Sequence, residues 1–176
     1  MVDYRRNYIK GGTYFFTLTL ASRQSQLLLK HIDLLRSAMK QVKNENSYKT
    51  KAIVVLPDHI HVIWELPDGD DNYSMRWRKI KRYFTIGLIK TGLPLLKNRH
   101  GEYNVWQRRF WEHTVKNDRD FEVHVNYIHY NPVKHGYVKR VIDWPFSSFH
   151  GYVKRNILTK DWAGGGDGLL GRQDGE

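Results

Sequence analysis

The chain has 176 residues, of which 40% are apolar and 14% aromatic, a composition that excludes a disordered chain and favours one domain with a substantial core. Its 29 lysines and arginines outnumber its 18 acidic residues, and the net charge of +11 favours a polyanionic partner such as nucleic acid. Because the sequence has no cysteine, it excludes disulfides and thiolate metal sites.

The first residues, MVDYRRNYIKGG, are charged and lack the apolar run of a signal peptide. No apolar stretch in the sequence is long enough to cross a bilayer. We therefore predict a cytoplasmic protein with no membrane partner.

Residues 11–20 alternate between two faces and predict a strand, with Tyr14, Phe16, Leu18 and Leu20 on the face that enters a core. A helix is expected next, from Ser25 to about Asn46. Its apolar positions recur at alternating steps of four and three residues, as an amphipathic helix requires. They are Leu28, Ile32, Leu35, Met39 and Val42.

Residues 51–57 and 59–67 are rich in β-branched side chains and predict two antiparallel strands joined around Pro57-Asp58. Ser74 is the expected cap of a helix over residues 75–90. In that helix the inward positions are Trp77, Ile80, Phe84 and Leu88. The cations expected on its outer surface are Arg76, Arg78, Lys79, Arg82 and Lys90.

Residues 105–115 predict a strand with two tryptophans beside Arg108 and Arg109. Asn117 then caps a helix over residues 118–131, which is expected to end near Pro132 because proline lacks a backbone N–H. These elements predict a single α+β domain over residues 1–160, with helices packed on an antiparallel sheet. The Gly-rich residues 161–176 predict a flexible C-terminal tail.

His59 and His61 are separated by one residue within a predicted strand, so their imidazoles project from the same face. Ile60, Val62 and Trp64 are expected to pack behind them. Such a pair is half of a metal site or a phosphate clamp, or else two hydrogen-bonded histidines on a half-exposed strand.

The sequence excludes three other kinds of histidine-containing active site. A histidine triad would need a third histidine where Ile63 stands, and a two-motif phosphoesterase would need a second His-x-Ser/Thr, which the sequence lacks. The zinc-protease pattern HExxH is also missing from the sequence.

The helix over residues 118–131 places His124, Tyr127 and Asn131 on one face, next to an apolar stripe of Phe121, Val125 and Ile128. Tyr127 is either a core tyrosine or a nucleophile, and we favour the nucleophile because a cysteine nucleophile is excluded. Tyr130 points to another face.

A tyrosine hydroxyl ionises only near about pH 10, so a divalent cation on the scissile phosphate would be needed to assist its attack. Two imidazoles and one amide oxygen would leave coordination positions open. Magnesium prefers oxygen ligands whereas imidazole favours manganese or zinc, so the residues leave the identity of the metal open.

Five blocks of sequence share a wider pattern: YRRNYIKGGTYFFT, LPDHIHVIWELPDGDDNYSMRWRKIKRYFT, WQRRFWEHTV, YIHYNPVKHGYV and DWPFSSFH. In these blocks, which span nearly all of residues 4–150, the chain resembles the REP-associated tyrosine transposases, a branch of the HUH single-tyrosine transposases. The resemblance implies a ferredoxin-like HUH nuclease fold.

The resemblance also implies roles for individual residues. His59, His61 and Asn131 would bind Mg²⁺ or Mn²⁺, and Tyr127 would cleave single-stranded DNA to give a 5′-phosphotyrosine and a free 3′-hydroxyl. The implied substrates are repetitive extragenic palindromes, REP or BIME-like hairpins with a guide tetranucleotide at the foot. The implied enzyme is a monomer that takes part in DNA transposition and recombination in association with the bacterial nucleoid.

DNA contacts are predicted from cations and from glycines that permit close approach of the backbone. The resemblance suggests that the N-terminal segment reads the tetranucleotide, while the other cations hold phosphates. The predicted set is Arg5, Arg6, Lys10, Gly11, Arg76, Arg78, Lys79, Arg82, Arg108 and Arg109.

Two alternatives stay open at this point. One is a hairpin-binding protein whose catalytic site is vestigial or regulatory. The other is a metal-dependent nuclease that uses water, with Tyr127 in a structural role.

Overall fold

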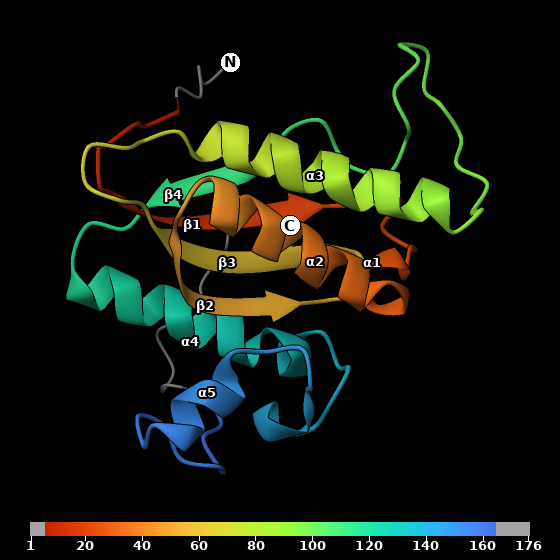
Figure 1. Ribbon diagram of the computed structural model, residues 1–176. Coiled ribbons are helices and arrows are strands. Elements are labelled where there is room, and N and C mark those ends of the chain that lie inside the picture. The colour runs from red at the N-terminus through yellow and green to blue at the C-terminus, as the bar shows by residue number, and fades with distance from the viewer. Residues whose placement is uncertain (1–5, 165–176) are drawn as a thin grey trace, which may run out of the picture.

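A four-stranded antiparallel sheet lies at the centre of the protein, in a computed structural model that describes residues 6–164 (Figure 1). Its strands are β1 (Thr13–Thr19), β2 (Lys49–Val55), β3 (His59–Glu65) and β4 (Trp111–Thr114). Their order across the sheet is β2-β3-β1-β4, and each neighbouring pair is antiparallel. With a helix after β1 and another after β3, this is a ferredoxin-like arrangement and confirms the predicted α+β fold.

Helices cover both faces of the sheet (Figure 1). On one face lie α1 (Leu27–Lys30), α2 (Ile32–Glu45) and α3 (Tyr73–Lys90). On the other lies α4 (Asp118–Lys134), followed by a 3-10 turn (Val141–Asp143) and α5 (Phe149–Lys154). None of the helices in residues 6–164 combines the length and apolarity that a membrane span requires.

The alternation of side chains along β3 sorts its residues between two cores. Ile60, Val62 and Trp64 join the core beneath α2 and α3, where the Trp64 ring stacks on Trp77 with 3.8 Å between centroids. Ile63 joins the core beneath α4. His59 and His61 therefore face α4, as the spacing predicted, and both are buried.

Several element boundaries differ from the sequence prediction. The helix expected from Ser25 to Asn46 is divided at His31 into α1 and α2. The cap of α3 is Asn72 rather than Ser74, because the Asn72 side chain accepts a hydrogen bond from the Met75 backbone N–H at 3.1 Å. Of the strand expected over residues 105–115, residues 111–114 form β4 and pair with β1, while Trp106 makes an isolated bridge with Leu20.

The α4 helix begins at its predicted cap but continues past its predicted end. The Asn117 side chain accepts a hydrogen bond from the Asp120 backbone N–H at 2.9 Å. The helix then runs through the buried Pro132 to Lys134, and the His135 N–H bonds the Asn131 carbonyl at 3.0 Å. Since proline removes a single N–H, bonds beyond it still close the final turn.

Arg76 was predicted to lie on the outer surface of α3, and this prediction is wrong. The side chain is 1% exposed and forms an ion pair with Asp70, with 2.6 Å between Nη2 and Oδ2. It also donates to the backbone carbonyls of Asn46, Ser47 and Asn72. Five acceptor contacts within its own chain make Arg76 a structural residue rather than a DNA contact.

Candidate active site

The His59 and His61 rings lie together on β3, with 4.8 Å between their centroids. The Nδ1 atom of His59 bonds Asp58 Oδ1 at 2.8 Å, and the Nδ1 atom of His61 bonds the Thr17 hydroxyl at 2.9 Å. These bonds fix the orientation of each ring through Nδ1 and direct Nε2 of each ring away from that bond.

Asp58 orients His59 and is itself held by Arg23, with 2.9 Å between Arg23 Nε and Asp58 Oδ2. Burial raises the pKa of Asp58, but the hydrogen bond and charge of His59 and the Arg23 guanidinium outweigh it, so the pKa lies below its usual value. The carboxylate thus accepts the Nδ1 proton of His59. His59 Nε2 is buried and has no hydrogen-bond partner among residues 6–164, which fits a metal ligand.

Tyr127 comes from α4 to the same face of the sheet. Its ring lies 5.1 Å from the His61 ring and is 2% exposed. The ammonium of Lys134 lies 5.0 Å from the centre of the Tyr127 ring. Asn131, one helical turn after Tyr127, is fully buried. The fold thus brings Tyr127 beside the histidine pair that the sequence singled out.

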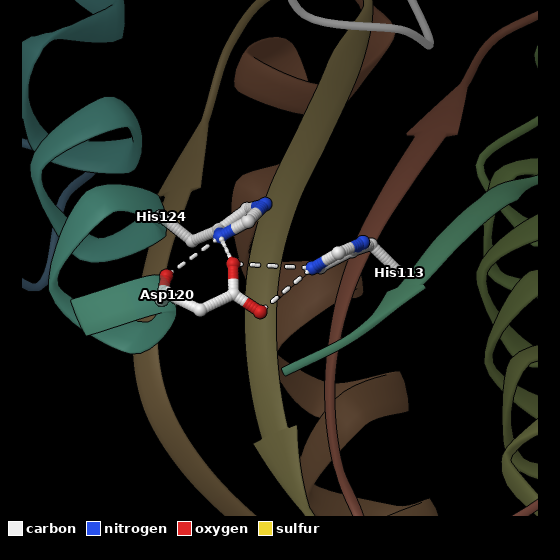
Figure 2. A group of neighbouring side chains, drawn as sticks. All are labelled: His113, Asp120 and His124. Atoms are coloured by element: carbon white, nitrogen blue, oxygen red, sulfur yellow. Dashed lines mark hydrogen bonds and ion pairs between the residues drawn. The ribbon is translucent and has the colours of Figure 1, made fainter. Parts of the chain in front are cut away.

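His124 shares a helical face with Tyr127 but belongs to a different cluster (Figure 2). Its Nδ1 lies 3.1 Å from Asp120 Oδ1 and donates to the Asp120 backbone carbonyl at 2.8 Å. His113 of β4 donates through Nε2 to the same carboxylate, at 2.9 Å from Oδ2. His113 and Asp120 were not among the predicted site residues, although the spacing of four residues between Asp120 and His124 was a usable signal.

Within this cluster, charge and burial shift the pKa values in opposite directions. Burial lowers the pKa of His124. Burial raises the pKa of Asp120, but hydrogen bonds from His113 and the Lys116 backbone N–H outweigh it, so the pKa lies below its usual value. The cluster therefore presents an anionic carboxylate between two imidazoles.

A basic pocket of about 580 Å³ lies beside the first turns of α3, away from the α4 face. Three predicted DNA-binding residues from separate segments meet there, Arg6, Arg78 and Arg108. The Arg6 guanidinium lies 4.3 Å from the centre of the Phe110 ring. Lys81 and Phe110, which were not among the predicted residues, line the same pocket.

The other predicted DNA-binding residues lie elsewhere. Lys10, Arg82 and Arg109 are exposed on the surface. Lys79 is tied to Glu45 of α2, at 2.8 Å. Gly11 has a φ of +69° and its N–H bonds the Asp70 carbonyl, so glycine is required there by the turn. Arg5 and residues 165–176, which include most of the predicted flexible tail, lie outside the described residues.

Comparisons with known proteins agree with this arrangement. The family model for IS200-like transposases matches residues 8–131. A REP-associated tyrosine transposase of Escherichia coli K12 is 51% identical over 164 residues, which cover 93% of this chain and 92% of the relative. A relative from Haemophilus influenzae is 48% identical over 169 residues, which cover 95% of this chain and 96% of that protein.

A solved structure gives the same assignment. It shows a REP-associated tyrosine transposase bound to a REP hairpin, and this chain matches it with a TM-score of 0.86 and 48% identity. The match covers all of this chain and 98% of that one. The chain is therefore a member of the IS200-like transposase family and belongs to its REP-associated tyrosine transposases.

Proposed function

We propose that this transposase is a metal-dependent single-stranded DNA endonuclease that cleaves and rejoins REP-type hairpins through a phosphotyrosine on Tyr127. The observation that carries the proposal is the position of Tyr127, whose ring lies 5.1 Å from His61 within the pair formed with His59. A nucleophile beside two fixed imidazoles is the arrangement that phosphoryl transfer on a held phosphate requires.

In the proposed cleavage step the Tyr127 Oη forms a bond to phosphorus, and the bond from phosphorus to the 3′ oxygen breaks. The phenol proton passes to solvent, and the departing oxygen takes up a proton to become a 3′-hydroxyl. Rejoining is the reverse reaction, in which a 3′-hydroxyl attacks the phosphotyrosine and Tyr127 regains its proton. Lys134, whose ammonium lies over the Tyr127 ring, adds positive charge beside the reacting phosphate.

His59, His61 and Asn131 are the proposed ligands of a divalent cation, Mg²⁺ or Mn²⁺. The buried Nε2 of His59 and the Asp58 and Thr17 bonds that orient both rings support this set. When bound, the cation would polarise the phosphate and stabilise developing negative charge. Because imidazole is a better ligand for manganese than for magnesium, we expect Mn²⁺ to bind more tightly.

The proposed substrate follows from the charge of the surface and from the relative that binds a REP hairpin. The basic pocket offers Arg6, Arg78 and Arg108 to phosphates and the Phe110 ring to a base. We propose that a monomer binds the hairpin there, with its guide tetranucleotide at the N-terminal segment. Lys10, Arg82 and Arg109 would extend the phosphate contacts along the surface.

The test is the formation of a covalent protein–DNA adduct that survives denaturation. Wild-type protein, a REP-type hairpin with a single-stranded 5′ extension and Mn²⁺ should give an adduct on a denaturing gel. Tyr127→Phe should give none while binding the same hairpin. Tyr130→Phe is the matched control, because it removes a hydroxyl from another face of the same helix and should leave the adduct unchanged.

Two results would replace the proposal with one of its alternatives. DNA cleavage by Tyr127→Phe at the wild-type rate would show that water is the nucleophile. Hairpin binding by the wild type without cleavage, in Mn²⁺ and in Mg²⁺, would favour a regulatory hairpin-binding protein.

A further inference from the structure

His113, Asp120 and His124 converge where β4 meets the start of α4 (Figure 2). Each residue offers one ligand atom, and these atoms all lie within 4.8 Å of one another. The side chains of His113 and Asp120 are 28% and 19% exposed, so an ion has access from solvent. The His124 side chain, at 8% exposed, closes the inner side.

This cluster is distinct from the histidine pair on β3. In the sheet His113 pairs with Phe15, whereas His61 pairs with Thr17, two residues further along β1. The Phe15 ring lies between the two groups, 4.8 Å from the His124 ring and 5.6 Å from the His61 ring. An apolar ring therefore separates the two sets of nitrogen donors.

The donors are two imidazole nitrogens and one carboxylate oxygen, a set that first-row divalent cations such as Zn²⁺ and Co²⁺ prefer. In the structure His113 Nε2 donates to Asp120 Oδ2, while His124 Nδ1 donates to the Asp120 backbone carbonyl and lies 3.1 Å from Oδ1 of the same residue. A cation between these atoms would take the lone pair of each nitrogen, and the proton that each nitrogen carries would move to the other nitrogen of the same ring by exchange with solvent. Water or phosphate oxygens would fill the remaining coordination positions.

The outer contacts of the carboxylate also fit a ligand. The Lys116 backbone N–H donates to Asp120 Oδ2 at 2.9 Å, and the Asp120 N–H is held by the Asn117 cap. Bonds of this kind orient a ligating carboxylate before the ion arrives.

We propose that His113, Asp120 and His124 form a second divalent-cation site that takes a Zn²⁺-class ion and joins β4 to α4. Because His124 lies three residues before Tyr127 on α4, an ion in this site fixes the helix that carries the proposed nucleophile. Binding to the folded state alone raises the unfolding temperature as the cation concentration increases.

The direct test is a titration with Co²⁺ followed by its visible absorption bands. A His59→Ala/His61→Ala background removes the β3 pair and should still bind one equivalent of Co²⁺. Adding His113→Ala should weaken that binding by more than about 100-fold, since losing a ligand costs at least as much as losing its outer-shell partner. His100→Ala, which alters an exposed loop histidine, is the matched control and should change nothing.

Wild-type protein provides a second measurement that does not depend on folding of the background. It should bind one equivalent of Co²⁺ more than His113→Ala, and Asp120→Asn should behave as His113→Ala does. In Zn²⁺-soaked crystals an anomalous peak should lie among the three side chains. Equal stoichiometry in wild type and His113→Ala, or no peak there, would overturn the proposal. Adduct formation by Tyr127 plays no part in these readouts, so the two proposals stand or fall separately.

Discussion

Lys81 shows how its surroundings change the chemistry of a single cation. Its ammonium donates to the Gln107 carbonyl at 2.9 Å and lies 5.7 Å from the centre of the Phe110 ring. Burial, with a smaller contribution from the Arg6 charge, lowers the pKa of Lys81 from 10.5 to about 8. The charge of this residue in the basic pocket therefore changes within an accessible range of pH.

We predict that the affinity for a REP-type hairpin falls as the pH is raised from about 7 to about 9, because Lys81 loses its proton and its attraction to phosphate. A bound phosphate raises the pKa of Lys81, so the midpoint of the loss should lie above the value of the free protein. Fluorescence anisotropy at constant ionic strength measures the effect. Lys81→Arg keeps its charge and should give a flatter profile; an equally steep one would assign the pH dependence to other groups.

At this scale the sequence predicted the residues whose chemistry depends on local spacing. His59 and His61 share a face because they alternate along one strand, and Tyr127 follows from helical spacing. Lys81 and His113 could not be identified in this way, because their partners come from other segments. The charge and the neighbours of such a residue depend on tertiary contacts, which cannot be read from the sequence.

Arg76 connects several elements through hydrogen bonds, so its loss should destabilise the whole fold. It connects α3 to the end of α2 through the Asn46 and Ser47 carbonyls and to the preceding loop through Asp70. Removing it leaves buried acceptors without a donor and Asp70 without its counter-ion. Asp70 is 34% exposed, so water partly compensates for the lost ion pair.

We predict that Arg76→Met lowers the free energy of unfolding by about 2–4 kcal/mol, the range for breaking one side of a buried polar network. Urea denaturation followed by circular dichroism measures the change. Arg82→Met removes an exposed arginine from the same helix and should stay within about 0.5 kcal/mol of wild type. Equal stability of the two variants would show that Arg76 is not structural.

The elements themselves were predicted best where a periodic pattern is long. The inward positions predicted for α3 are all buried, and the two β-branched runs form β2 and β3. The strand expected over residues 105–115 is shorter in the structure. The exposed Arg108 and Arg109 lie in a connection, and the strand β4 comprises residues 111–114. The end of α4 was predicted too early because of Pro132. A proline near the last turn removes one hydrogen bond without stopping the helix.

At the scale of the molecule the net charge of +11 favours a polyanionic partner. The basic pocket is lined in part by residues of α3. The helices α3 and α4 lie on opposite sides of the sheet (Figure 1). A hairpin held at the pocket must therefore extend around the sheet for its scissile strand to reach Tyr127. Cations along this route would determine the register of cleavage as well as affinity.

Hairpin binding should consequently weaken with salt in proportion to the phosphates that are held. Each phosphate contact to single-stranded DNA adds about 0.7 to the slope of log K against log salt concentration, and each to a duplex about 0.9. We predict that Arg78→Ala/Arg108→Ala lowers the slope by about 1.4–1.8. Anisotropy titrations between about 50 and about 300 mM salt measure the slope.

The matched control is Lys154→Ala, which removes an exposed charge from α5 on the opposite side of the sheet from α3. If the pocket holds phosphates, this variant keeps the wild-type slope although it also lowers the net charge. If the overall charge acts alone, each lost cation reduces affinity by a similar small amount and the double variant shows no special loss of slope. A slope shared by wild type, Lys154→Ala and the double variant would therefore remove the basic pocket from the DNA interface, while leaving the site around Tyr127 to be judged by adduct formation.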